Sequence, residues 1–100
     1  MELYVIRRRN AWKSPQELEA VAARSRAVGD NEMPTKVRWI RSYVVSEADG
    51  TLGTVCIYQA VSPQAIREHA ARVGMPADEI VPVATTVIVR DDPQSLEKAA

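Results

Sequence analysis

Cysteine is nearly absent from this chain: Cys56 is the only one in 100 residues. A single cysteine excludes an internal disulfide and is typical of a reducing compartment. The N-terminus, MELYVIRRRN, has a short apolar run with its charges after it, which predicts neither a signal peptide nor a membrane-spanning segment. These features favour a cytoplasmic protein.

An excess of either charge is also absent, because 13 basic residues balance 13 acidic ones. A general nucleic-acid or membrane-surface binder would need a basic surplus, so both classes are disfavoured. The run Arg7–Arg9 lacks interleaved aromatic residues and is expected to be surface charge at a strand end. The glycines have no phosphate-binding spacing, and no pair of carboxylates suggests acid–base catalysis. Little charge repulsion opposes self-association.

The apolar pattern predicts one domain over residues 1–90 with a polar tail over residues 91–100. Strands are expected at 3–8, 36–46, 53–60 and 79–90, because these segments are rich in β-branched and aromatic residues. Two helices are expected to start at Ser14-Pro15 and Ser62-Pro63 and to stop at Gly29 and Gly74. The order strand, helix, strand, strand, helix, strand predicts a ferredoxin-like βαββαβ α+β fold: a four-stranded antiparallel sheet with two helices on one face.

The predicted sheet is apolar on both faces. Simple alternation places Val37, Trp39, Tyr43 and Val45 on one face of the second strand, and Ile40 and Val44 on the other. On the third strand, Val55 and Ile57 oppose Cys56, Tyr58 and Ala60. Two helices cover only one face, so a second copy is expected on the other, as in a dimeric α/β barrel. The second part of the last strand, residues 85–90, would reach across to the partner.

The segment CIYQAVSPQAIREHA contains both the only cysteine and the only histidine, Cys56 and His69. Cys56 fits a small buried hydrophobe, and His69 fits either a core histidine or the polar group of a pocket. A nucleophilic Cys–His pair is disfavoured because no third orienting group stands out. Trp39, Arg41 and Tyr43 fit either a dimer interface or a pocket wall, completed by Tyr58, in which Arg41 binds an anionic group.

Several short motifs in residues 36–83 resemble a family of small bacterial proteins known as nickel-binding-protein-like, a domain of unknown function. The motifs are Trp39 with Ser42-Tyr43-Val44, then Cys56-x-Tyr58-x-Ala60, residues 65–70 (AIREHA) and Gly74-x-Pro76-Ala77. The resemblance implies a ferredoxin-like dimer. It also implies a divalent metal such as nickel as cofactor. The family pattern has histidine at Arg41 and acidic residues at Arg7 and Gln59, so three possible ligands are replaced here.

Three hypotheses follow. The first is a small homodimeric protein that binds a divalent metal (Ni²⁺) through His69 and Cys56, which the resemblance implies. The second is a cofactor-independent enzyme or binder of a small organic anion, in which Arg41 holds the anion and His69 handles a proton. The third is a dimerisation module without a small ligand. No organic cofactor, nucleic acid or membrane is expected.

Overall fold

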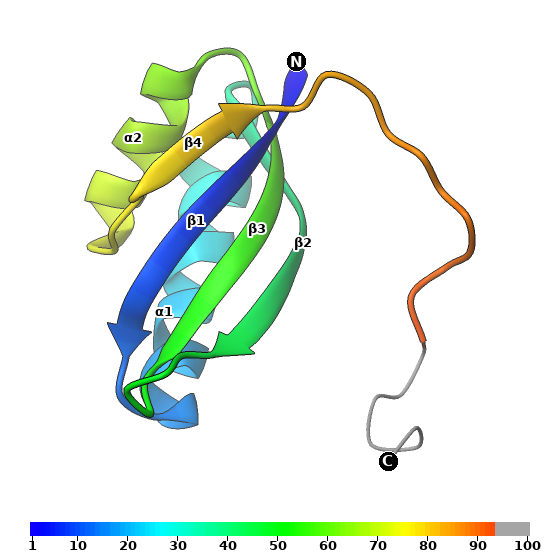
Figure 1. The fold of residues 1–100 in the computed structure, drawn as a ribbon. Coiled ribbons are helices and arrows are strands. Elements are labelled where there is room, and N and C mark those ends of the chain that lie inside the picture. Colours follow the sequence, from blue (N-terminus) through cyan, green and yellow to red (C-terminus); the bar gives the residue numbers. More distant parts are fainter. Residues whose placement is uncertain (94–100) are drawn as a thin grey trace.

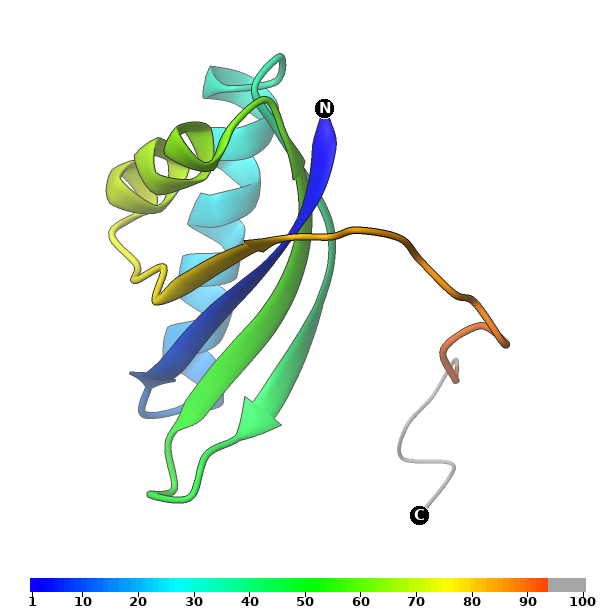
Figure 2. The same ribbon diagram turned by 45° about the horizontal axis from the view of Figure 1, so that its top comes forward.

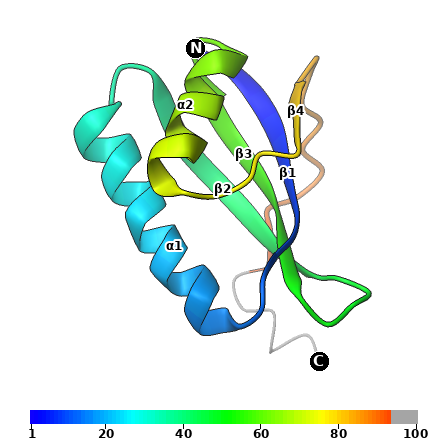
Figure 3. The same cartoon turned by 90° about the vertical axis from the view of Figure 1, so that its left-hand side faces the viewer.

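The computed structural model describes residues 1–93. Its elements, labelled in Figure 1, run in the following order: β1 (Glu2–Trp12), α1 (Pro15–Ala27), the π-helical turn η1 (Val28–Glu32), β2 (Val37–Ser46), β3 (Leu52–Ala60), α2 (Pro63–Val73) and β4 (Glu79–Pro82). The strands form one antiparallel sheet in the order β2-β3-β1-β4. Both helices lie on the same side of it (Figure 3). The predicted ferredoxin-like α+β fold is therefore confirmed.

The helix starts follow the two Ser-Pro pairs. The hydroxyls of Ser14 and Ser62 accept hydrogen bonds from the amides of Glu17 and Ala65, at 3.2 and 3.1 Å. The following proline loses nothing, because its position has no helical hydrogen-bond acceptor. Gly74 ends α2 in the left-handed region, with φ of 85°. Both helix starts and the stop of α2 at Gly74 were predicted from the sequence.

The predicted stop of α1 at Gly29 is wrong. The chain continues through η1, and the amide of Val28 donates to the carbonyls of Arg24 and Ser25. Gly29 does not adopt a positive φ, so it does not serve as a left-handed cap. The π-helical turn instead carries the chain to Met33, which is buried in the core.

The core lies between the sheet and the helices, on what we call the helix face. It is built from alternate residues of β1 and β3, from one side of α2, and from η1 and the segment after it: Tyr4, Ile6, Cys56, Tyr58, Ala60, Ala65, Ile66, Val73, Val28, Met33 and Val37. Ile66 is fully buried, and burying a side chain of this size stabilises the fold by about 1.5–3 kcal/mol. The opposite side of the sheet, which no helix covers, is the open face.

A β-bulge at Ile40 changes the predicted faces of β2. Trp39 pairs with Tyr58, and Arg41 pairs with the next residue back along β3, Ile57, so one extra residue is inserted between them. Trp39 therefore lies on the helix face, whereas Arg41 and Tyr43 lie on the open face. The prediction that Trp39 and Tyr43 share a face is wrong, because strict alternation cannot anticipate a bulge.

The last predicted strand is shorter than expected. β4 pairs with β1 only over Glu79–Pro82, and the amide of Val83 then donates to the carbonyl of Leu3. Residues 83–92, which we call the arm, leave the sheet on the side away from the helices (Figure 2). Pro82 has no amide hydrogen, which weakens further pairing at this edge. The proposed boundary at residue 90 stays a prediction, and most of the predicted tail lies outside the described residues.

Candidate functional site

A cavity of about 750 Å³ lies between α1 and the sheet. One face of α1 forms one wall, and β1, β2 and β3 form the other. The α1 residues that line the cavity include Leu18, Val21, Ala22 and Ser25, together with the charged Glu19 and Arg26. Leu18, Val21 and Ala22 are only half-buried. A cavity of this size falls within the range of small-molecule sites, about 300–1,000 Å³.

Arg8 is the unexpected member of this cavity. It follows Tyr4 and Ile6 with the two-residue period of a strand, so its side chain is directed to the helix face. It lines the cavity and is only 1% exposed. None of its three guanidinium nitrogens has a hydrogen-bond partner among the described residues. The guanidinium lies over the ring of Tyr58, whose centroid is 5.8 Å from the guanidinium carbon, and this contact is attractive.

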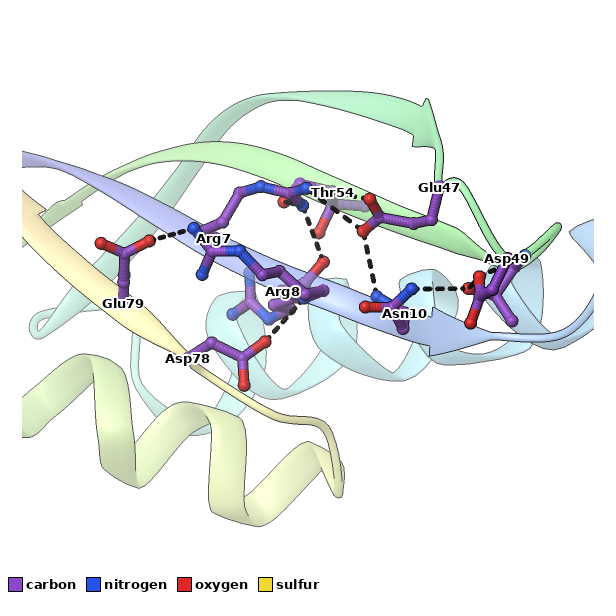
Figure 4. A network of polar contacts seen from close by, with 10 residues as sticks. Arg7, Arg8, Asn10, Glu47, Asp49, Thr54, Asp78 and Glu79 are labelled. Atoms are coloured by element: carbon purple, nitrogen blue, oxygen red, sulfur yellow. Dashed lines mark hydrogen bonds and ion pairs between the residues drawn. The ribbon is translucent and has the colours of Figure 1, made fainter.

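The neighbouring arginines are paired. Arg7 donates to both carboxylate oxygens of Glu47, at 3.1 and 3.2 Å (Figure 4), and Arg9 pairs with Glu79. The amide of Asn10 also donates to Glu47, and this bond, together with that of Arg7, lowers the pKa of the Glu47 carboxyl. The prediction of surface charge therefore fits the exposed Arg9 and is wrong for Arg8. The two-residue period of β1 was the sequence signal that could have identified Arg8 as an inward-facing residue.

Thr54 lies directly opposite Arg8 in the β1–β3 ladder and also lines the cavity. Its hydroxyl is buried and has no partner among the described residues. Directly opposed side chains on one face of a sheet have Cβ atoms about 4.5–5.5 Å apart. The cavity therefore has two neighbouring polar groups with unused hydrogen-bonding capacity.

An aromatic wall borders these groups. The rings of Trp39 and Tyr58 are stacked, with centroids 6.1 Å apart and planes inclined by 11°. The indole of Trp39 donates to Ser42 at 2.7 Å, and the Ser42 hydroxyl donates to the sulfur of Cys56 at 3.0 Å. The cavity is also lined by Trp12, so both tryptophans of the chain border it. Of the predicted ligand residues, Trp39 and Tyr58 are thus brought together.

His69 lies behind this wall and does not line the cavity. It is 1% exposed, its Nε2 is 3.0 Å from the carbonyl oxygen of Ser25, and its ring meets that of Tyr58 edge to face. The phenol of Tyr58 bonds the Ser25 hydroxyl at 3.1 Å, and burial raises the pKa of that phenol. Cys56 reaches the cavity, and His69 does not. The pocket expected to join Arg41 to His69 is therefore not formed.

Burial lowers the pKa of His69, and the nearby Arg8 charge lowers it further, against an opposing hydrogen bond to Ser25. The unfolded chain keeps the ordinary value of about 6.5 and binds the proton more readily. Stability should therefore be full above that value and fall as pH drops through it towards the folded pKa. We expect the urea midpoint to decrease between about pH 7.5 and about pH 5, above the range in which Glu47 and Asp49 titrate. His69→Leu should make the urea midpoint less dependent on pH in this range. An unchanged pH dependence in that variant would contradict the attribution of the effect to His69.

Arg41 and Tyr43 form a separate site on the open face. The Tyr43 hydroxyl donates to Asp92 at 2.8 Å, and Arg41 pairs with the same carboxylate at 3.2 Å. These bonds hold the end of the arm against β2. Arg41 borders the cavity at the bulge, but its guanidinium is already engaged with Asp92 and Tyr43. The anion-binding role predicted for Arg41 therefore has less support than the same role for Arg8.

Potential metal ligands are sparse. Within residues 1–93 there is no group of three or more His, Cys, Asp or Glu side chains arranged to hold an ion. Cys56 lines the cavity whereas His69 does not, and the charge of Arg8, which is felt at His69, would repel a cation. These side chains fit an anion better than they fit a resident nickel ion.

Fold and cavity together define a ferredoxin-like domain with a ligand-sized space between α1 and its sheet. The chain belongs to the family described as "Nickel responsive protein SCO4226-like", whose model matches residues 4–83. A similar solved structure is "Crystal structure analysis of SCO4226 from Streptomyces coelicolor A3(2)", which is 21% identical with a TM-score of 0.68 and matches 85% of this chain and 99% of that one. At this identity the likeness concerns the fold. No curated protein matches the chain.

The family assignment confirms the resemblance stated from the motifs. No described helix is long and apolar enough to cross a membrane.

Proposed function

We propose that this protein binds a small organic molecule in the cavity between α1 and the sheet. The observation that carries the proposal is the cavity itself, with its aromatic wall and its two buried, unpartnered polar groups. An apolar space with a few convergent polar groups is the usual form of a small-molecule site. His69 lies outside the cavity wall, so binding has more support than the proton-transfer chemistry considered for Arg41 and His69.

Filling the cavity should abolish binding. Ala22 faces the cavity from the middle of α1, so Ala22→Phe places a ring in it, whereas Ala23→Phe places the same ring on the exposed side of that helix. We expect calorimetry with a panel of planar aromatic probes, 4-nitrobenzoate and 4-nitrobenzamide among them, to show binding to the parent chain and to Ala23→Phe. Ala22→Phe should lose at least ~10-fold in affinity, or about 1.4 kcal/mol. If no probe binds the parent chain, the proposal is wrong.

A second candidate is nickel binding. It rests on the printed description of the family and on the free Nδ1 of His69, which has no partner among the described residues. Cys56 is the other proposed ligand, and imidazole and thiolate both suit such ions. The same calorimetric experiment, run with nickel chloride, distinguishes the two candidates. Binding heat in the parent chain that disappears in His69→Ala would support nickel binding. An absence of binding heat in the parent chain would rule out nickel binding.

We also propose that the protein is a homodimer in a reducing, cytoplasmic setting. The open face carries a row of apolar residues across three strands, Val81, Val5 and Ile57, which are paired in register. In the arm, Val87, Ile88 and Val89 are 84%, 76% and 78% exposed. The arm runs from β4 to β2, the two edge strands, on the open side of the sheet. A second copy that brings the same apolar row and arm would bury both.

A further inference from the structure

We propose that Arg8 and Thr54 form an anion-binding subsite, so that the molecule held in the cavity is a planar organic carboxylate. This inference rests on the proposed small-molecule function and specifies its ligand. The subsite is distinct from the metal ligands and from Arg41, because it is formed by the facing residues of β1 and β3 on the helix face.

The charge of Arg8 has no ion-pair partner within residues 1–93. The acids that pair with its neighbours are already engaged: Glu47 binds Arg7 (Figure 4), while Asp78 and Glu79 bind the amide and the side chain of Arg9. No described carboxylate lies within ion-pair distance of Arg8. A guanidinium cannot shed its proton at physiological pH, so a buried, unpaired one is costly to retain.

The unpaired N–H donors of Arg8 have a geometry that suits a carboxylate. A guanidinium presents parallel N–H groups that match the two oxygens of a carboxylate. Thr54 adds a hydroxyl beside it, which can donate to the same group. The ring of Tyr58 attracts the guanidinium charge but accepts none of its N–H groups in an ordinary hydrogen bond. A carboxylate satisfies both the charge and the donors.

The volume and the aromatic lining of the cavity indicate the rest of the ligand. An inorganic ion would fill little of a cavity of about 750 Å³. Trp39 and Tyr58 stack nearly parallel and form a flat wall, to which Trp12 adds a further aromatic surface. Flat walls favour flat partners in an offset stack. One unpartnered guanidinium supports one negative charge, because the cavity's other arginines, Arg26 and Arg41, are paired with Asp30 and Asp92. The carboxylates of Glu19 and Asp30 also line the cavity and disfavour a second negative charge on the ligand. The geometry thus points to a planar monoanion.

The test compares 4-nitrobenzoate with 4-nitrobenzamide, which have the same shape but differ in charge. Both tryptophans line the cavity, so intrinsic fluorescence, corrected for probe absorbance, reports occupancy alongside calorimetry. We expect the parent chain to prefer the carboxylate at least ~10-fold. Arg8→Met should remove this preference, so that the two probes bind this variant with similar affinity. Arg9→Met removes an exposed arginine one residue away and should keep the preference.

If the amide binds as tightly as the carboxylate, or if Arg8→Met still prefers the carboxylate, the proposed anion-binding subsite is wrong and the small-molecule function stands. If neither probe binds the parent chain, both are wrong. Thr54→Val keeps the shape of the side chain and should lower carboxylate affinity by less than Arg8→Met does. A folding defect in Arg8→Met would appear in its circular dichroism, and Arg8→Lys, which keeps the charge but not the fork, should then show a partial preference.

Discussion

Replacement of Arg8 by methionine is expected to stabilise the ligand-free protein. The side chain is 1% exposed and its guanidinium has no hydrogen-bond partner within the described residues, so the folded state retains a desolvated charge. Methionine fills similar space without that charge. Substitution of buried ionic groups by well-packed apolar ones stabilises proteins by up to about 1–4 kcal/mol. We expect the upper part of this range, reduced by the lost attraction to the Tyr58 ring.

Urea denaturation at equal protein concentration measures this effect. For a domain of this size, 1 kcal/mol corresponds to a shift of about 4–8 °C in Tm, so thermal melting is a second readout. The matched control is Arg9→Met, which removes an exposed ion pair and should cost only about 0–1 kcal/mol. Clear destabilisation by Arg8→Met would mean that Arg8 is satisfied in solution and would contradict the account of the cavity. A variant that is more stable and no longer selects an anion would show that the site is maintained at the expense of stability.

Substitution of Ile57 by glutamate is expected to dissociate the proposed dimer. Ile57 lies in the middle of the open face, between Val5 of β1 and Arg41 of β2. A carboxylate at the centre of an apolar interface is desolvated, at a cost of about 3–5 kcal/mol when it is unpaired. The neighbouring Arg41 is already paired with Asp92 and so does not offset this cost. The dimer should then weaken by ~100-fold or more, since each 1.4 kcal/mol corresponds to about a factor of ten.

Sedimentation equilibrium provides the measurement. The chain has a mass of 11.1 kDa, and the parent protein should sediment at twice that value. Gln59→Glu is the matched control: Gln59 lies on the same strand and face, but it is already polar and faces Leu3 and Arg38. This variant should remain dimeric. A parent protein that sediments as a monomer at micromolar concentration would leave the open face exposed to water and would contradict the proposed assembly.

Most of the fold could be predicted from local chemistry. The two Ser-Pro pairs set the helix starts, and alternation on β3 separated Val55 and Ile57 from Cys56 and Tyr58 as observed. Errors arose where one residue changes the local geometry. The bulge at Ile40 reversed the face of every later residue of β2, and the π-helical turn extended α1 beyond Gly29. Neither has a reliable signal in a single sequence.

The candidate site was predicted less completely. Trp39 and Tyr58, which were expected to share a pocket wall if one forms, are stacked, and His69 is buried, as a core histidine would be. Arg8 was missed because it stands between two surface arginines, and composition treats the three alike. What distinguishes them is ion pairing between residues far apart in sequence: Arg7 pairs with Glu47 and Arg9 with Glu79, whereas Arg8 has no such partner in the part of the chain that the structure describes. Such contacts depend on the folded chain.

The central claim is that the buried Arg8 guanidinium receives the negative charge of a bound ligand. Nitrogen-15 NMR of the arginine side chains tests it most directly, with the Arg8 Nε–Hε signal assigned by its loss in Arg8→Met. We expect 4-nitrobenzoate to shift that signal downfield in a saturable manner while the signals of Arg7 and Arg9 stay in place, and 4-nitrobenzamide to leave it nearly unchanged. An Arg8 signal that does not move while the carboxylate is bound would contradict the claim.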